Sequence, residues 1–392
     1  MLLLLACGVD AMSLTPMGTG VATTTHPNGF VQAHLGQGWQ RCEGLAEFLA
    51  DCADDAPAGV LLTAERAAYS TALPDGALAL DATSRSVGVQ TTLRALAERG
   101  TPVIAVADGE VKGAAAVGLF LSCSHRVCTP RALLSLPECR IGLCPASALA
   151  FRSSYGRHGP SSHVAMYMAL TGAPLTAHDC VSLALATHFV QKEQLEPMLI
   201  ELQVCPPGEA RVPLERRTEP NAPRSQASLF ADGVSAPLDA ALRDVFGDAE
   251  DAADCLVRLG ASLDRARMLS QSSAWHTREC ADAVVDVLDG AERALRAGSP
   301  SAVAATFDVM RTSASLDAAA AQRLGLVVND HLSGLDDFKE LCDRTTGGAA
   351  TGGAAGRSSR PRWQPAALDE GLVRRLADRV AQQGGRAQPT AR

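Results

Sequence analysis

Residues 101–119 read TPVIAVADGEVKGAAAVGL, and this stretch indicates an α/β fold. The apolar run that follows Pro102 predicts a strand buried in the interior. The alanine-rich run from Gly113 to about His125 predicts a helix. A buried strand followed at once by a helix is typical of layered α/β proteins.

The same alternation extends to both sides of this stretch, from about Gly18 to Val190. Short runs rich in small and β-branched residues predict strands at residues 20–26, 58–64, 125–130 and 132–137. Amphipathic runs predict helices at residues 38–53 and 89–100, the second closed by Gly100.

The second half of the chain has a different pattern. A Pro-rich segment at residues 205–223 is expected to run over the surface. From Pro237 to about Cys342 the sequence is alanine-rich and predicts helices, one of them starting at Ser299-Pro300 with a cap and a first-turn proline. A Gly/Ala linker and a last helix at residues 369–383 follow.

These patterns divide the chain into six segments. They are an N-terminal extension (1–17), an α/β core (18–200), a Pro-rich connection (201–236), a helical region (237–342), a Gly/Ala linker (343–360) and a basic tail with a helix (361–392).

The charge of the chain is unevenly distributed. The 392 residues carry a net charge of −8, which argues against a surface that coats nucleic acid generally. Residues 351–392, however, hold eight arginines and three acids, a net charge of +5 that leaves −13 for the rest. Such a tail either seeks phosphate or is simply solvated, and a GC-rich gene would also produce the excess of arginine over lysine.

Metal, disulfide and membrane signatures are missing from the sequence. The twelve cysteines include no C-x-x-C pair, so we expect no metal site and a reduced, intracellular protein. His125, His163 and His178 have no partner at metal-ligand spacing, and we interpret His188 as a packing residue. No run reaches the roughly 18 apolar residues of a membrane span. The apolar start MLLLLACG is too short for a secretory signal, and no arginine-rich transit peptide is visible.

Several motifs together resemble the 3-hydroxyisobutyryl-CoA hydrolase family of the crotonase superfamily. TPVIAVADGEVKGAAAVGL is similar to that family's strand, turn and Gly-rich helix start, and LPECRIGLCP (136–145) to its Pro-Glu-x-x-Ile-Gly-Leu-x-Pro segment. MALTGAPLTAHDCVSLALATHFV (168–190) is the most specific match, and SPSAVAATF, QRLGLV, DDFKE and PRWQPAAL follow in the family's order. The resemblance implies a crotonase core of stacked β-sheets with flanking helices and a C-terminal helical region.

The resemblance also implies acyl-CoA thioester hydrolysis, but the acids are incomplete. Glu138 matches the family's first catalytic acid, whereas Ala146 stands where the second acid belongs. A third family acid aligns with Val89 or Gln90, neither of which ionises near neutral pH. Such acids position and activate water, so their loss predicts a weakened site.

The implied oxyanion hole is altered as well. Its two backbone donors map to Ala114 and Ala72. Ala114 can serve only if its backbone does not require a positive φ. Near Ala72, the bulky Leu73 and the restrictive Pro74 occupy a turn where the family has small residues, which is the more damaging change.

Two hypotheses therefore remain open. In the first, the chain is a non-catalytic scaffold in a large assembly, best guessed as the small subunit of the mitochondrial ribosome, with ribosomal proteins and rRNA as partners and no membrane or DNA partner. Six tail arginines would then contact RNA or protein: Arg357, Arg360, Arg362, Arg374, Arg375 and Arg379. In the second, it is an active mitochondrial hydrolase of valine breakdown that uses Glu138. Coenzyme A enters only with this second hypothesis, as the substrate thioester.

Overall fold

A computed structural model gives the fold of the chain. The structure describes residues 15–17, 20–36, 44–64, 76–146, 161–220, 222–223, 228–230, 236–336, 338–339 and 371–384.

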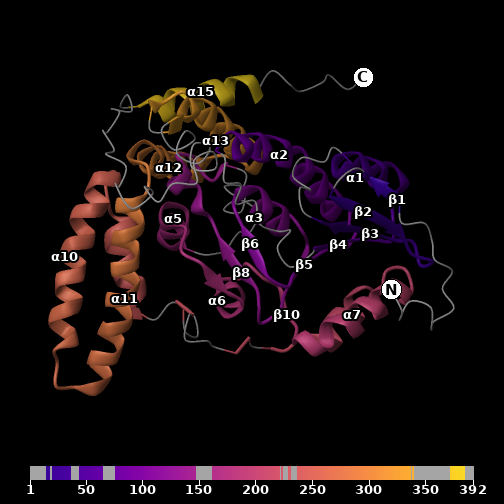
Figure 1. Ribbon diagram of the computed structural model, residues 1–392, viewed down its shortest axis with the longest axis horizontal. Helices are drawn as coiled ribbons and strands as arrows, with labels where there is room; N and C mark the ends of the chain where they lie inside the picture. Colours follow the sequence, from indigo (N-terminus) through magenta and orange to yellow (C-terminus); the bar gives the residue numbers. More distant parts are fainter. Residues whose placement is uncertain are drawn as a thin grey trace, which may run out of the picture.

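A seven-stranded mixed sheet organises the first half of the chain (Figure 1). Strands β1, β2 and β3 pair in antiparallel fashion, and the pairs from β3 onward are parallel. In spatial order the strands are β1 (Thr15–Met17), β2 (Val21–Thr25), β3 (Phe30–Leu35), β4 (Gly59–Ala64), β5 (Val103–Ala107), β7 (His125–Cys128) and β10 (His188–Phe189).

A smaller sheet of three strands lies beside it. It is built from β6 (Glu110–Lys112), β8 (Leu133–Ser135) and β9 (Leu175–Thr176). The β6–β8 pair is parallel and the β8–β9 pair is antiparallel. Two stacked sheets with helical cover match the expected α/β architecture.

The central strands are buried on both faces, as the uninterrupted apolar runs predict. All five residues of β5 are buried, and so are the first five of β4. Because successive side chains of a strand point to opposite faces, they divide between two clusters. Val103 and Ala105 join the main core, whereas Ile104 and Val106 join a second cluster with Met198.

Helices from different parts of the chain cover the two faces. The main core includes buried residues of α1 (Gly44–Asp55), α2 (Gly76–Glu98) and α3 (Ala114–Leu121). The second cluster is closed by α7 (Lys192–Val204) and α8 (Arg211–Arg217).

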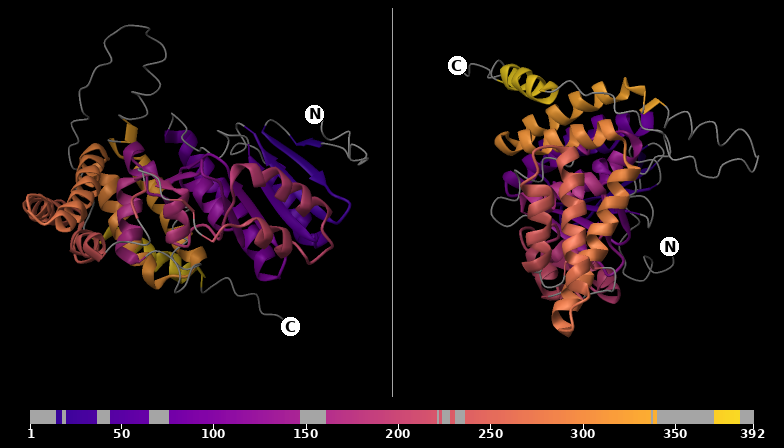
Figure 2. Two further views of the ribbon diagram at one scale, coloured as in Figure 1. Left: turned by 90° about the horizontal axis from the view of Figure 1, so that it is seen from below. Right: turned by 90° about the vertical axis from the view of Figure 1, so that its left-hand side faces the viewer.

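The C-terminal region is helical, as expected. It comprises α9 (Ala236–Leu242), a π-helical turn η6 (Arg243–Gly247), α10 (Ala252–Ser270), α11 (Trp275–Ala297), α12 (Pro300–Thr312), a 3₁₀ turn η7 (Ser313–Ser315), α13 (Ala318–Ser333) and α15 (Leu372–Gly384). The α10–α11 hairpin stands at the end of the molecule opposite to β1–β3, and α12, α13 and α15 lie together along one side (Figures 1 and 2). The predicted cap of α12 is confirmed, since the Ser299 hydroxyl accepts from the N–H of Ala302 at 3.1 Å.

The core and the C-terminal region share one hydrophobic interior and several buried polar contacts. The Asn329 side chain of α13 accepts from the N–H of Cys144 at 2.7 Å and donates to its carbonyl at 2.9 Å. Farther along the same helix, Gln322 donates to Gln90 of α2 at 2.5 Å. Near the start of α5 (Ser162–Thr171), His163 Nε2 lies 2.7 Å from a carboxylate oxygen of Asp239 on α9.

Several boundaries differ from those predicted. The helix expected at 89–100 begins at Gly76, and the helix expected to reach His125 ends at Leu121, which leaves His125 to start β7. The Pro-rich connection contains α8, whose Leu214 is fully buried because the helix packs on α7. Within the described residues, no helix is both long enough and apolar enough to cross a membrane.

We expect Asn329→Ala to lower the free energy of unfolding by about 2–4 kcal/mol, because it leaves the buried N–H and carbonyl of Cys144 without partners. Urea unfolding measures this difference. The neighbouring exposed Asp330→Ala on the same helix is the control, with an expected change within about 0.5 kcal/mol. Equal effects of the two substitutions would contradict the clamping role of Asn329.

Candidate functional site

Glu138 lies on a 3₁₀ turn, η3 (Pro137–Ile141), that follows β8. Pro137 fits the first position of such a turn, because proline has no N–H and none is needed there. Gly142 ends the turn in the left-handed conformation, with φ 78°, and its N–H bonds the Glu138 carbonyl. The local sequence thus fixes the backbone that presents Glu138.

The carboxylate of Glu138 meets the N-terminus of α3. Gly113, with φ 91°, turns the chain from β6 into this helix, and the N–H of Ala114 donates to Glu138 Oε1. Ala56 and Ala184 are the non-glycine residues with positive φ in the described part of the chain. Ala114 therefore does not need the glycine-specific conformation that would have excluded it as a backbone donor.

Glu138 is held in an apolar environment. Its side chain is buried, and Oε2 has no hydrogen-bond partner among the described residues. Burial raises the pKa of Glu138 to about 7, although the Ala114 N–H, which stabilises the anion, acts in the opposite direction. Near neutral pH this group therefore exists in both protonation states.

Ala146 follows at the end of the same segment and is fully buried. Its N–H donates to the Cys144 carbonyl at 2.7 Å, the oxygen that Asn329 also contacts. A methyl group at this position supplies neither a proton nor a negative charge. The segment from Glu138 to Ala146 thus carries one ionisable carboxylate in the expected place of two.

The position of the third acid is used for packing and hydrogen bonds. Val89 and Gln90 are both buried in α2. Gln90 accepts from Gln322, and its amide donates to Ser86 at 3.3 Å. Arg94 extends the network by donating to Gln322 at 2.7 Å. This polar network joins α2 to α13, a role that no local sequence pattern predicts.

His188 and His125 lie together where β10 pairs with β7. Their ring centroids are 5.6 Å apart, and burial lowers the pKa of His188 to about 4, with a further contribution from His125. A neutral imidazole at the edge of a sheet agrees with the packing interpretation of His188. In the described part of the chain, no group of three or more histidine, cysteine or acidic side chains is placed to hold a metal ion.

The tail arginines divide between described and undescribed residues. Arg374, Arg375 and Arg379 lie on the exposed face of α15. The opposite face buries Val373 and Leu376 with their neighbours against α12 and α13. The other predicted positions lie outside the described residues: Arg357, Arg360, Arg362, Ala72, Leu73 and Pro74.

The stacked sheets, the glycine turn into α3 and the Pro-Glu turn define a crotonase-type protein. The chain belongs to the enoyl-CoA hydratase/isomerase family, whose sequence model matches residues 91–376. The resemblance recognised in the sequence is thereby confirmed at the level of the superfamily and fold.

Solved structures support the same fold. The chain is similar to a carnitinyl-CoA dehydratase from Mycobacterium thermoresistibile, with a TM-score of 0.63 and 19% identity over 91% of this chain and 96% of that one. It is also similar to an enoyl-CoA hydratase from Rhodobacter sphaeroides, with a TM-score of 0.65 and 18% identity over 92% and 97% of the two chains.

Proteins with similar sequences match a shorter part of the chain than the solved structures do, but their names specify an activity. The 3-hydroxyisobutyryl-CoA hydrolase of Xenopus laevis is 34% identical over 97 residues, which is 25% of this chain and 24% of the relative. The 3-hydroxyisobutyryl-CoA hydrolase-like protein 1 of Arabidopsis thaliana is 30% identical over 104 residues, or 26% and 24%. The alignments span about a quarter of each relative, and both relatives are named as mitochondrial.

We expect Glu138 to make stability fall as pH rises. Its pKa is about 4.5 before folding and about 7 after it, so unfolding releases a proton between these values. Between these pH values the free energy of unfolding of the unmodified protein should fall by about 3 kcal/mol relative to that of the Glu138→Gln variant, because the glutamine side chain does not ionise. Urea unfolding at pH 4.5 and pH 7.5 measures the difference. Exposed Glu98→Gln is the control, and parallel pH profiles for parent and Glu138→Gln would refute the assignment.

Proposed function

We propose that this protein is a non-catalytic, hydrolase-like member of its family that serves as a structural component of a large ribonucleoprotein assembly. The observation that carries the proposal is the state of the site: Ala146 places a methyl group where an acid is needed, and Glu138 contacts the N–H of Ala114. The one remaining carboxylate is thus bound to the donor that would otherwise face a thioester oxygen.

The energetic consequences of this arrangement are large. Loss of one acid–base group typically slows a reaction by about 10²–10⁴-fold. Loss of one oxyanion donor slows it by about 10²–10³-fold. The buried polar contacts of Asn329 and Gln322, by contrast, keep the C-terminal helices closed on the core. Such a chain retains a rigid surface while its chemistry is weakened.

The exposed face of α15 supports a contact with an anionic partner. Arg375 and Arg379 are four residues apart, so they share one side of the helix, and Arg374 lies next to them. The helix is anchored through its buried apolar side, which holds the arginines outward. Guanidinium groups suit phosphate because they donate in pairs. Among such assemblies we favour the small subunit of the mitochondrial ribosome, in keeping with the mitochondrial names of the relatives.

One observation favours the alternative of an active acyl-CoA thioester hydrolase. A general acid–base works best when its pKa lies near the working pH, and burial raises the pKa of Glu138 to about 7. In that reaction Glu138 would take a proton from water, the resulting hydroxide would add to the thioester carbonyl, and coenzyme A would leave as the thiol. The N–H of Ala114 would then have to exchange the carboxylate for the developing oxyanion.

Steady-state turnover separates the two functions. We expect hydrolysis of 3-hydroxyisobutyryl-CoA by the purified protein to be at least about 10³-fold slower than by an intact hydrolase, given the missing acid. Coenzyme A release is measured, with Glu138→Gln as the matched variant. A turnover of about 1–10 s⁻¹ that Glu138→Gln abolishes would establish the enzyme instead.

The assembly is tested by co-sedimentation with mitochondrial ribosomal small subunits over a range of salt concentrations. Each phosphate contact contributes about 0.7–0.9 to the slope of log affinity against log salt. We expect changing Arg374, Arg375 and Arg379 to Glu to weaken binding and reduce that slope by about 2. The charge-matched control changes three exposed arginines on two other helices to Glu: Arg211 on α8, and Arg278 and Arg293 on α11. An unchanged slope in the α15 variant would exclude this helix as the contact.

A further inference from the structure

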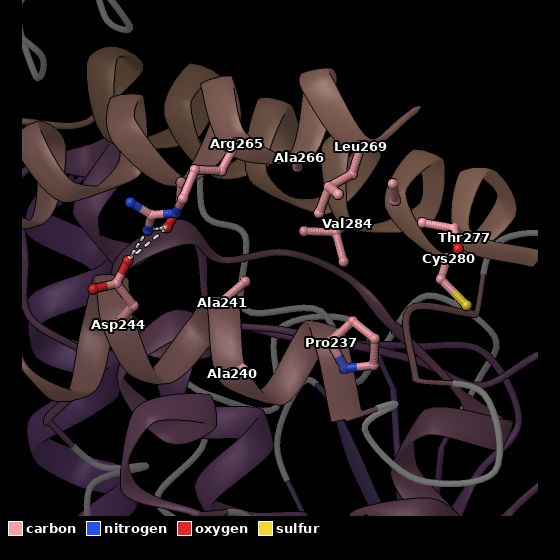
Figure 3. A pocket seen from close by; sticks show the side chains of 12 residues that line it. Pro237, Ala240, Ala241, Asp244, Arg265, Ala266, Leu269, Thr277, Cys280 and Val284 are labelled. Carbon is pink, nitrogen blue, oxygen red and sulfur yellow. Dashed lines mark hydrogen bonds and ion pairs between the residues drawn. The ribbon is translucent and has the colours of Figure 1, made fainter. Parts of the chain in front are cut away.

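A pocket of about 560 Å³ lies between α9, η6, α10 and α11, away from the Glu138 segment (Figure 3). Three stretches contribute to it with the same spacing of i, i+3, i+4 and i+7, which places each set on one helix face. Pro237 begins the set from α9 and η6, Ser262 that of α10, and Thr277 that of α11. The pocket is thus a consequence of how the hairpin packs beside α9.

Small apolar side chains form most of the wall. At the i+4 position each of the three sets carries an alanine, whose short side chain leaves space between the helices. The apolar wall is made by Ala240, Ala241, Ala266, Leu269, Ala281 and Val284. A volume of this size with an apolar lining falls in the range of small-molecule sites, about 300–1,000 Å³.

Polar groups gather at one end of the pocket. Arg265 Nη2 donates to the Ser262 hydroxyl at 2.7 Å and also to Asp244 (Figure 3). Ser262 in turn donates to Asp244 at 2.7 Å, and Arg258 Nη1 lies 3.4 Å from the other carboxylate oxygen. Asp244 therefore accepts hydrogen bonds from several donors. Of the Arg265 guanidinium it contacts Nη2 only.

Arg265 retains hydrogen-bonding capacity toward a ligand. Its side chain is 57% exposed, and within the described part of the chain Nε and Nη1 have no acceptor. Nη1 carries two N–H groups and Nε carries one, so Arg265 can still donate a charge-assisted hydrogen bond to a carboxylate oxygen. Toward the other end the lining is Leu269, Val284 and the partly exposed Cys280. The pocket is consequently amphiphilic, with the Arg265–Asp244 ion pair at one end and an apolar body.

We propose that this pocket binds a free fatty acid, with its alkyl chain along the alanine-lined wall and its carboxylate on Arg265. Arg265 is the one cation among the described lining residues, and its guanidinium can be shared between Asp244 and the carboxylate headgroup, while the alkyl chain matches the apolar lining. The site shares no residue with the Glu138 segment, so it stands or falls independently of the proposed function.

Calorimetric titration of the full-length protein with octanoate, decanoate and dodecanoate tests the apolar part. Each methylene that enters the pocket should strengthen binding about three- to fourfold. Ala240→Trp fills the pocket from an exposed helix position and should abolish binding, whereas the equally exposed Ala283→Trp on α11, outside the pocket, should not. Binding that survives Ala240→Trp, or that ignores chain length, overturns the proposal.

The headgroup is tested on the same helix. Arg265→Gln should weaken dodecanoate binding about tenfold, the loss expected for one charge-assisted contact at a partly exposed site. Arg267→Gln is the control, because Arg267 pairs with Asp289 and does not line the pocket. Dodecyltrimethylammonium, which has the same chain and the opposite charge, should bind weakly. Equal binding of the two amphiphiles contradicts the carboxylate assignment.

Cys280 gives a second readout in the unmodified protein. Its thiol lines the pocket, while the other described cysteines are buried. Dodecanoate should slow the alkylation of Cys280 by iodoacetamide. The rate is measured by mass spectrometry of the peptide that contains Cys280. Unchanged alkylation would refute occupancy. Protection that grows with protein concentration in the absence of dodecanoate would assign the pocket to a second copy of the chain and overturn the proposal.

Discussion

Cys144 lies in the segment that runs from Glu138 to Ala146, and it is buried. The side chain of Asn329 hydrogen-bonds both the N–H and the carbonyl of Cys144. A buried peptide group without partners is costly, so the site segment keeps its conformation only while α13 is docked. The docking of α13 is supported in turn by the contact of Gln322 with Gln90. The conformation of the site is therefore tied to the C-terminal region as well as to the sheet.

The electrostatics of Glu138 reflect two opposing effects. Burial disfavours the charged form, whereas the N–H at the start of α3 and the dipole of that helix favour it. Burial is the larger effect, which is why the pKa rises to about 7 despite the hydrogen bond. In a site with a second acid nearby, a similar carboxylate could share a proton or a water molecule. In this chain the Glu138 carboxylate accepts a hydrogen bond from the protein's own backbone, at the N–H of Ala114.

Away from the Glu138 segment, the C-terminal region presents two chemically different surfaces. On α15, buried apolar residues hold a pair of adjacent arginines and a third one turn later toward solvent. Beside the α10–α11 hairpin, alanines leave an apolar pocket with an arginine at one end. Both surfaces belong to helices that follow the α/β core in the chain, and both carry arginine.

Much of the fold follows from local pattern in the sequence. The runs around Val103 and Leu61 are continuous and apolar because both faces of those strands are covered, and Pro137, Gly142 and Gly113 fix the turns by their own backbone preferences. The absence of an acid at Ala146 is also a property of the sequence alone. The polar contacts between the core and the C-terminal helices could not be predicted from the sequence pattern, because they join residues that are distant in the chain.

Gln322 and Gln90 are 232 residues apart, and Asn329 and Cys144 are 185 apart, so no local periodicity links them. The direction in which Glu138 points, the pKa that burial gives it, and the space between α9 and the hairpin likewise depend on how separate elements pack. Sequence determined which groups are present and how the chain turns locally. Only the packing of those elements determined which groups meet, because burial and hydrogen bonding are properties of the assembled interior.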